Sequence, residues 1–236
     1  MTDGTAATQE FYSRYATVYD LVARRTPGVA DLRESVIAAL DPQPGDTVVE
    51  MGCGTGANFP HLRERVGPSG TVVGVDFTPG VLAVARDRVE REGWENVHVV
   101  RGDATRPPLC EADAVLATFV SGMLPDPAAA VRTWATLVGP DGRLALGDLG
   151  RSTSPLGRPL NAVFAGLVRA TTPPGGGRRM DSPATLLDER LVAAHSELER
   201  LCTGVRRDVR ALGFARVRGG RVREDAVESE ANRDGT

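Results

Sequence analysis

The stretch Val48-Val49-Glu50-Met51-Gly52-Cys53-Gly54-Thr55-Gly56 decides the fold of this chain. Two β-branched residues lead into an acid and then into three glycines at alternate positions, which predicts a strand that ends in a tight loop. Because glycine carries no side chain, the backbone of such a loop can approach a ligand closely. The stretch therefore predicts a strand of an α/β sheet whose carboxyl end carries a binding loop.

Two further acids fall where a second and a third strand are expected to end. Asp76 follows the β-branched run 71–75, and Asp103 follows the run 97–102. The carboxyl ends of parallel strands meet at one edge of a sheet, where α/β proteins bind their ligands. A glycine loop with acids at the next two strand ends therefore indicates a nucleoside-binding crevice.

Composition narrows the class of protein. The 236 residues are 41% hydrophobic and 25% charged, with a net charge of −3, which predicts one α/β domain and gives no sign of a nucleic-acid partner. All 28 basic residues are Arg, because the sequence contains no Lys. The missing Lys excludes Schiff-base catalysis and a Walker-type phosphate site, and it fits either GC-rich codon usage or salt adaptation.

Cysteine usage and hydropathy predict where the protein works. Three widely spaced cysteines favour a reducing cytoplasm over a disulfide or zinc framework. No apolar run approaches the roughly 20 residues of a membrane span. We therefore expect a cytoplasmic protein without a membrane span, and the oligomeric state stays open.

Periodicity predicts a Rossmann-like, doubly wound, mostly parallel sheet flanked by helices. We expect an N-terminal helical cap over residues 1–40, with a second helix at about 30–40, and the main domain over 41–222. The expected strands are 47–51, 71–76, 97–101, 113–118 and 143–148, and the expected helices between them are 57–66, 79–92 and 127–138.

Beyond residue 150 the alternation of strands and helices becomes less regular. An apolar helix at 155–170 and a Pro/Gly-rich loop after it predict a lid over 155–180. Helices are expected near 184–202 and 205–212, and a sixth strand begins at 213–217. A seventh strand after Val222 is poorly defined, and residues 223–236 are expected to be a disordered tail.

The glycine loop by itself leaves two cofactors open. Gly52, Gly54 and Ala57 satisfy the Gly-x-Gly-x-x-Gly/Ala pattern of dinucleotide-binding loops, so the loop alone could belong to an NAD(P)-dependent oxidoreductase. Against this, Glu50 would place like charge beside a pyrophosphate, and Asp103 suits an exocyclic amino group. An acid beside the loop instead suits the cationic amino acid portion and sulfonium of S-adenosylmethionine.

Three motifs together resemble those of class I S-adenosylmethionine-dependent methyltransferases. The pattern Glu50-x-Gly52-x-Gly54-x-Gly56 is similar to the first motif of that family, Val75-Asp76-Phe77-Thr78 to the ribose-binding second strand, and Gly102-Asp103-Ala104 to the adenine-binding third. The resemblance covers roughly residues 8–150.

The resemblance implies roles for individual residues of this chain. The loop of Gly52, Cys53 and Gly54 would pack against the methionine moiety, and Glu50 would fix its polar groups. Asp76 would accept hydrogen bonds from the ribose hydroxyls while Phe77 lies against the adenine. The remaining cofactor contacts would be Asp103 at the adenine amino group with Ala104 beside it, and Thr118 and Phe119 near the methyl-donor end. Asp76 and Asp103 could alternatively serve only as helix caps.

The N-terminal aromatic residues resemble the cap of the small-molecule ubiquinone/menaquinone C-methyltransferase group, which implies that Tyr19 covers the cofactor. That group carries an Arg-Asn pair where this chain has Gly122 and Met123, so the resemblance does not extend to the acceptor. Asp148, at the end of the fifth expected strand, and Tyr19 are the candidate catalytic residues. Asp148 could also merely cap the next segment.

No metal site is expected, because the three histidines are isolated in the sequence, with His195 assigned to a polar helix face. Cys53 is interpreted as a small loop residue and not as a nucleophile.

The expected reaction is in-line transfer of the sulfonium methyl group of S-adenosylmethionine to a small, partly apolar acceptor. The acceptor atom stays open. A non-catalytic S-adenosylmethionine-binding regulator is the alternative, and an NAD(P)-dependent oxidoreductase is a less favoured one.

Overall fold

A computed structural model describes residues 29–171 and 183–226 of the chain. These residues form a seven-stranded sheet in the order β3-β2-β1-β4-β5-β7-β6. The strands are β1 (Thr47–Met51), β2 (Thr71–Asp76), β3 (Val97–Arg101), β4 (Ala114–Thr118), β5 (Arg143–Leu149), β6 (Cys202–Arg210) and β7 (Ala215–Val222). Strands β1 to β5 are mutually parallel, and β7 is antiparallel to both β5 and β6. The predicted doubly wound, mostly parallel fold is confirmed.

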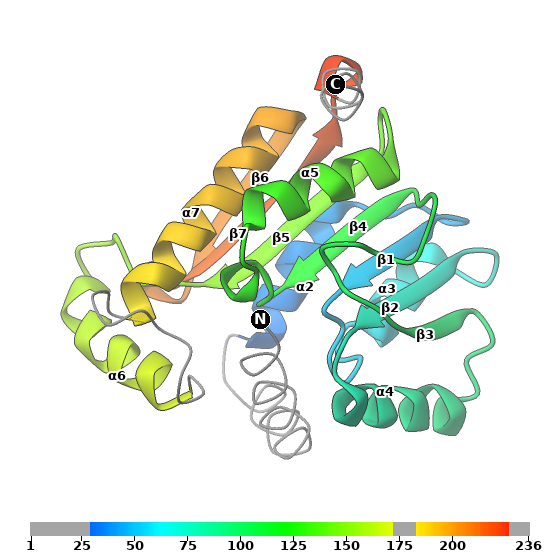
Figure 1. Cartoon of the computed structure of the whole chain (residues 1–236), viewed down its shortest axis with the longest axis horizontal. Helices are drawn as coiled ribbons and strands as arrows, with labels where there is room; N and C mark the ends of the chain where they lie inside the picture. The colour runs from blue at the N-terminus through cyan, green and yellow to red at the C-terminus, as the bar shows by residue number, and fades with distance from the viewer. Residues whose placement is uncertain (1–28, 172–182, 227–236) are drawn as a thin grey trace.

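Helices cover both faces of the sheet (Figure 1). They are α2 (Val29–Leu40), α3 (Phe59–Val66), α4 (Pro79–Glu92), α5 (Pro127–Val138), α6 (Asn161–Thr171) and α7 (Pro183–Leu201), with 3-10 turns η1 (Ser121–Met123), η2 (Arg158–Leu160) and η3 (Ala211–Gly213). One apolar core joins α2, α3 and α4 to the sheet, and a second joins α5 and α7 to its other face. The strands are therefore buried on both sides, as parallel sheets require.

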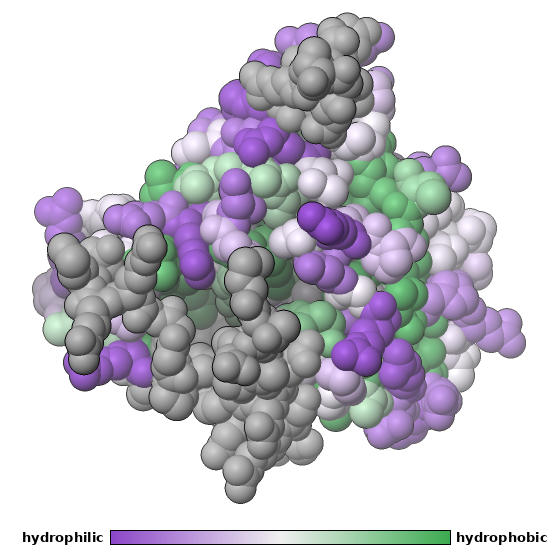
Figure 2. All heavy atoms as spheres, in the orientation of Figure 1, coloured by the Kyte–Doolittle hydropathy of each residue, from purple (hydrophilic) through white to green (hydrophobic). Residues whose placement is uncertain are grey.

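The sequence of the strands explains these two cores. Successive side chains of a strand point to opposite faces, so Val48 packs under α2 and α3 while Val49 packs under α5 and α7. On the outside, hydrophilic residues cover much of the face shown in Figure 2, and the hydrophobic residues that reach it lie between them. None of the helices in the described ranges is long and apolar enough to cross a membrane.

Helix α2 confirms the helix expected at about 30–40 and shows where it packs. It contacts β4, β5 and β7. Its residues Val36, Ile37 and Leu40 are buried in the core beneath the sheet. The helix that we assigned to an N-terminal cap is thus part of the layer that covers one face of the sheet. The preceding residues of the expected cap, including Tyr19, lie outside the described residues.

The helix expected near 205–212 is wrong, because this segment forms the edge strand β6 followed by η3. Val205, Val209 and Leu212 recur at spacings of four and three, which imitates one face of a helix. Pairing with β7 overrides that pattern and leaves Val209 64% exposed. A register shift between Thr203 and Arg206 bends the strand at Gly204, which has a φ of +61°.

The strand predicted to begin at 213–217 is β7, which runs on to Val222 and is the antiparallel strand of the sheet. The second half of β7 was not predicted because it contains Gly219 and Gly220, and glycine is unfavourable within strands. A Cβ at Gly219 would lie 2.5 Å from the carbonyl oxygen of Ala39, so this glycine lets α2 approach the sheet.

Two predicted boundaries near the C-terminal part of the chain change. The apolar segment 155–170 is not one helix: η2 precedes α6, and the hydrogen bonds of Asn161 with Ser152 fix the junction. The disordered tail expected from residue 223 is wrong for 223–226, because Ala226 is only 3% exposed and belongs to the core with α5 and α7. Residues 172–182 of the expected lid and 227–236 of the tail lie outside the described residues.

Candidate functional site

The candidate site lies where the order of the strands reverses. The chain passes from β3 at one edge of the sheet back to β4, beside β1, so the carboxyl ends of β1 and β4 flank the switch point at which α/β proteins bind ligands. A cavity of about 50 Å³ opens there. Its lining consists of Arg33, Glu50, Gly52, Cys53, Gly54, Thr55, Ala57, Asn58, Thr118 and Phe119. Six of the residues predicted from the sequence therefore lie around one cavity.

The glycines of the loop after β1 have different structural reasons. Gly52 and Gly54 both have a positive φ, of +67° and +54°. A Cβ at Gly52 would lie 2.2 Å from the side chain of Val120, so close packing requires glycine there. A Cβ at Gly54 would meet nothing within 4 Å. Gly54 therefore leaves open space beside the cavity, as expected of a loop that approaches a ligand.

Asp76 connects the end of β2 to this loop. Its carboxylate oxygens accept hydrogen bonds from the backbone N–H of Gly54 (3.0 Å) and of Thr78 (2.8 Å). Burial raises the pKa of Asp76, and these backbone donors oppose that rise. The capping alternative is incomplete, because the cap residue of α4 is Thr78 and Asp76 also holds the glycine loop. Each carboxylate oxygen has a further lone pair, so Asp76 can still accept from a ligand.

Glu50 is the most unusual group of the site, with only 2% of its surface exposed. Its Oε1 accepts hydrogen bonds from Asn58 Nδ2 (2.6 Å) and from the hydroxyl of Thr118 (3.4 Å). Burial raises the pKa of Glu50 to about 8, against the lowering effects of Asn58 and Arg33. Its Oε2 and the Oδ1 of Asn58 are buried and have no hydrogen-bond partner in the described part of the chain.

Four lining residues were not predicted as site residues: Thr55 and Ala57 belong to the glycine loop, and Arg33 and Asn58 lie outside it. Arg33 comes from α2 and is 8% exposed. It shares the inward face of that helix with Leu32, Val36 and Ile37, so a charged residue on an apolar face was the signal that could have found it. Asn58 precedes α3 and bridges Glu50 to Thr118. No sequence pattern distinguishes it from an ordinary helix cap.

The residues predicted for the adenine end lie farther along the same edge of the sheet and do not line the cavity. Asp103 is exposed and accepts hydrogen bonds from the N–H and hydroxyl of Thr105. Ala104 accepts one from the indole of Trp134. Phe77 is half-buried beside Asp76. The ends of β2 and β3 are joined at this edge, because the N–H of Gly102 donates a hydrogen bond to the carbonyl of Asp76 (2.9 Å).

Phe119 occupies an unfavourable backbone conformation at the end of β4. Its φ is +60°, which bulky residues rarely adopt, and its N–H bonds the carbonyl of Gly147. Residues held in such conformations are concentrated at binding and catalytic sites. The strain at Phe119 therefore marks the same cavity as Glu50 and the glycine loop.

Cys53 is buried beneath the loop, and burial together with Glu50 and Asp76 raises the pKa of its thiol well above the ordinary value. A thiol is a poor nucleophile in that state, which agrees with its interpretation as a small loop residue. Within the ranges that the structure describes, no group of three or more His, Cys, Asp and Glu residues could hold a metal ion.

The placement of His195 on a polar helix face is wrong. His195 is 3% exposed and lies in α7 between the core residues Ala194 and Leu198. Its Nε2 is 3.1 Å from Oδ2 of Asp148, which is itself 1% exposed at the end of β5. The sequence of α7 contains many acidic and basic residues, which made the apolar face that carries His195 difficult to recognise. Asp148 is therefore not a simple cap, because its carboxylate has a buried partner 47 residues away.

We expect His195→Ala to lower the free energy of unfolding by about 2 kcal/mol, because it leaves the buried carboxylate of Asp148 without its partner. Urea unfolding measures this change. His98→Ala, at an exposed position of β3, is the control and should change stability by less than about 0.5 kcal/mol. Equal stability of the two variants would contradict the pairing of Asp148 with His195.

Comparisons with known proteins identify the domain. The family model described as a methyltransferase domain matches residues 48–142, which include the glycine loop, Asp76 and Thr118. A nocamycin O-methyltransferase of Saccharothrix syringae is 37% identical over 138 residues, which are 57% of this chain and 48% of that protein. An aklanonic acid methyltransferase of Streptomyces sp. strain C5 is 33% identical over 107 residues, 44% of this chain and 49% of that protein. This chain thus spans about half the length of these two relatives.

Solved structures show the same fold. A SAM-dependent methyltransferase from Aquifex aeolicus matches with a TM-score of 0.58 and 20% identity, over 83% of this chain and 93% of that one. A SAM-dependent methyltransferase from Thermotoga maritima matches with a TM-score of 0.60 and 17% identity, over 90% and 98%. The motifs, the topology of the sheet and these matches agree: residues 48–142 match the methyltransferase domain, and the chain is similar in sequence and fold to S-adenosylmethionine-dependent methyltransferases.

Proposed function

We propose that this protein transfers the methyl group of S-adenosylmethionine to a small, partly apolar acceptor at the carboxyl ends of β1 and β4. The observation that supports this most is the buried carboxyl group of Glu50, whose Oε2 has no hydrogen-bond partner in the described part of the chain and which lines the cavity together with Gly54. Burying an unpaired polar atom is unfavourable, so the site fits a polar ligand, and a positively charged group of that ligand would favour the ionised form of Glu50, which accepts hydrogen bonds.

We propose contacts for S-adenosylmethionine from one end to the other. Glu50 would hold the ammonium of its methionine portion, and Arg33 would lie near the carboxylate. Asp76 would accept from the ribose hydroxyls, and Asp103, on the neighbouring strand end, from the adenine amino group. Phe77 and Ala104 would flank the adenine, and Tyr19, outside the described residues, is proposed to cover the site. When bound, this cofactor supplies a methyl group that is already activated on a sulfonium.

The protein's own contribution to such a reaction is alignment and the exclusion of water. The glycine loop, held by Asp76 and by the buried Arg88 at the carbonyl of Gly56 (2.6 Å), forms a rigid wall of the cavity. Thr118 and Phe119 also line the cavity. A fixed, largely dry site lowers the barrier for in-line displacement without a strong acid or base. We propose that Asp148, which is paired with His195, helps to position the acceptor.

Apolar side chains near this edge favour a small, partly apolar acceptor. Leu156, Leu160 and Val163 are exposed on and before α6, and Phe164 of the same helix packs on Phe214 with ring centroids 5.3 Å apart. We propose that residues 155–180 form a lid that contacts the acceptor. The names of relatives, among them nocamycin, aklanonic acid and demethylmenaquinone methyltransferases, are consistent with an acceptor of this class.

Acceptor-dependent formation of S-adenosylhomocysteine tests the proposal. The full chain is incubated with S-adenosylmethionine and a set of small phenolic, enolic and amine acceptors, and the product is measured by mass spectrometry. We expect methylated product for at least one acceptor, and a lower kcat/KM with an unchanged S-adenosylhomocysteine affinity for Asp148→Asn. Tight cofactor binding without product from any acceptor would instead favour a non-catalytic regulator.

We also propose that the protein works in the cytoplasm. All three of its cysteines are free, and Cys110 is exposed, which suits a reducing compartment. Cell fractionation with an antibody to the chain tests this location, and recovery from an extracellular or membrane fraction would contradict it.

A further inference from the structure

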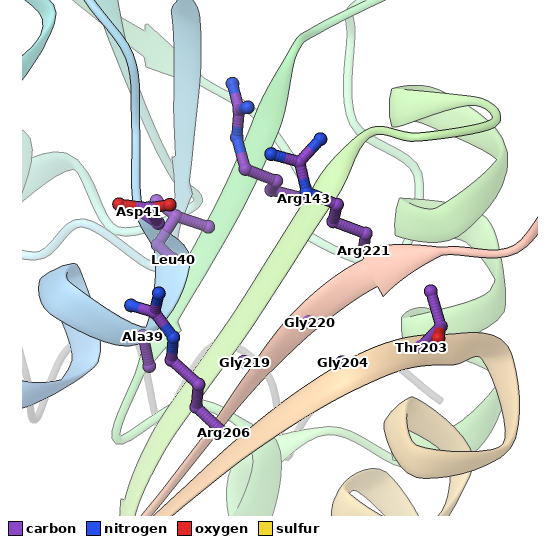
Figure 3. A pocket seen from close by; sticks show the side chains of 10 residues that line it. All are labelled: Ala39, Leu40, Asp41, Arg143, Thr203, Gly204, Arg206, Gly219, Gly220 and Arg221. Carbon is purple, nitrogen blue, oxygen red and sulfur yellow. The ribbon is translucent and has the colours of Figure 1, made fainter.

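Figure 3 shows a second cavity, of about 180 Å³. It lies where β5 begins, whereas the candidate site lies where β1 and β4 end. It is formed by the end of α2, the first residue of β5 and the β6–β7 hairpin. Its charged lining residues are Arg143, Arg206, Arg221 and Asp41. The lining therefore carries three guanidinium groups against one carboxylate, and we call it the basic cavity.

Two of these arginines lie directly opposite each other in the sheet. Arg143 of β5 pairs with Arg221 of β7 in the antiparallel register, and Figure 3 shows both side chains extending from these neighbouring strands toward the same side. Like charges at directly opposed positions destabilise a sheet unless an anion compensates them. Asp46 forms an ion pair with Arg143, but the Nε of Arg143 is buried and has no hydrogen-bond partner among the described residues.

Most other arginines of the β6–β7 hairpin differ from those of the basic cavity in having carboxylate partners. Carboxylates neutralise most of them: Glu199 pairs with Arg207 and Arg218, Asp208 with Arg210, and Asp225 with Arg223. Arg206 and Arg221 have no carboxylate within ion-pair distance in the part of the chain that the structure describes. Arg206 donates one hydrogen bond, to the carbonyl of Ala38 at 2.9 Å. Both of these uncompensated cations face the basic cavity.

The backbone gives this cavity room for a ligand. Gly204 lies within the register shift of β6, between Thr203 and Arg206. A Cβ at Gly204 would meet no atom within 4 Å. Guanidinium groups bind phosphate oxygens through pairs of parallel N–H donors, and they remain charged at any physiological pH. The arrangement therefore suits a compact anion with several oxygen acceptors.

We propose that the basic cavity binds a phosphate-type oxyanion, either free or as the phosphoryl group of a small metabolite, through Arg221, Arg206 and the Nε of Arg143. This site is separate from the methyl-transfer site and does not depend on the proposed function. Arg221 would be its main ligand, because no other described group engages that side chain.

Calorimetric titration of the full chain with inorganic phosphate, at constant ionic strength maintained with sodium chloride, tests this site. We expect saturable binding to one site, weakened about tenfold or more by Arg221→Gln or Arg206→Gln, because each substitution removes charge-assisted hydrogen bonds. Arg210→Gln is the matched control: it removes an exposed arginine of the same hairpin that lies outside the cavity lining, and it should bind phosphate within about twofold of the wild type.

Glycerol phosphate in a parallel titration distinguishes the two sources of the anion. Tighter binding than inorganic phosphate indicates a phosphorylated metabolite, and weaker binding indicates the free ion. Absence of saturable binding in the wild type, or equal affinity in the wild type and Arg221→Gln, would overturn the site. The affinity of each variant for S-adenosylhomocysteine, which we expect to equal that of the wild type, shows that the methyltransferase domain is intact.

Discussion

Gly54→Val is expected to weaken the binding of S-adenosylhomocysteine by about 100-fold or more, the largest effect on cofactor binding that we expect from a single substitution. Gly54 has a φ of +54°, and a Cβ there would point into space that no protein atom fills within 4 Å. If the cofactor occupies that space, a valine side chain must displace it. Calorimetric titration of the wild type and the variant measures the change.

The control for this substitution must separate loss of space from backbone strain. Gly93, at the end of α4, has a φ of +62°, and a Cβ added to it would also meet nothing within 4 Å. Gly93→Val therefore carries similar left-handed strain, about 1–2 kcal/mol, at a place far from the cavity. We expect it to bind S-adenosylhomocysteine like the wild type. Equal affinities of Gly54→Val and the wild type would show that the loop does not contact the cofactor.

The second large effect concerns the pH dependence of stability and comes from Glu50. Burial raises the pKa of Glu50 in the folded chain to about 8, against 4.5 for the group in an unfolded chain. Between these values the folded chain keeps the proton that the unfolded chain loses. Unfolding then releases a proton, so raising the pH favours unfolding by up to about 1.4 kcal/mol per pH unit, or about 5 kcal/mol over the window.

Urea unfolding at pH 5, 6, 7 and 8 of the wild type and Glu50→Gln measures this contribution. The free energy of unfolding of Glu50→Gln, relative to that of the wild type, should rise between pH 5 and pH 8 and become constant above the pKa of Glu50. Glu197 and Glu199 have pKa values lowered by their arginine partners, so their contributions are already complete above pH 4.5. Parallel stability curves for the two proteins would show that Glu50 ionises at its ordinary pKa in the folded chain.

The sequence predicted the part of the fold that is decided locally. Strands that are buried on both faces have apolar sequences, and most turns between 41 and 142 contain Gly or Pro, so the core elements were found with small errors. The β6–β7 hairpin was missed in part because the spacing of Val205, Val209 and Leu212 is compatible with one face of a helix as well as with an edge strand. Only the pairing of β6 with β7 decides between them.

The candidate site was predicted to the extent that its residues belong to strand ends. Glu50 and Gly54 lie in and just after the end of β1, and Thr118 ends the neighbouring β4, so their meeting follows from a parallel sheet. Arg33 comes from a helix before the first strand, and its place under the loop depends on how α2 packs across the sheet. The partner of Asp148, His195, lies on a helix far along the chain. Contacts of this kind are tertiary and leave no local pattern.

The affinity for S-adenosylhomocysteine of the wild type and of Asp76→Ala tests the central claim most directly. The carboxylate of Asp76 bonds the N–H of Gly54 and, when the cofactor is bound, is expected to bond the ribose hydroxyls. We expect tight binding by the wild type, binding about 30-fold weaker by Asp76→Ala, and no change in Asp87→Ala, which removes an exposed acid of α4. Equal affinity of Asp76→Ala and the wild type, or binding of NAD but not S-adenosylhomocysteine, would contradict the assignment of the cofactor site.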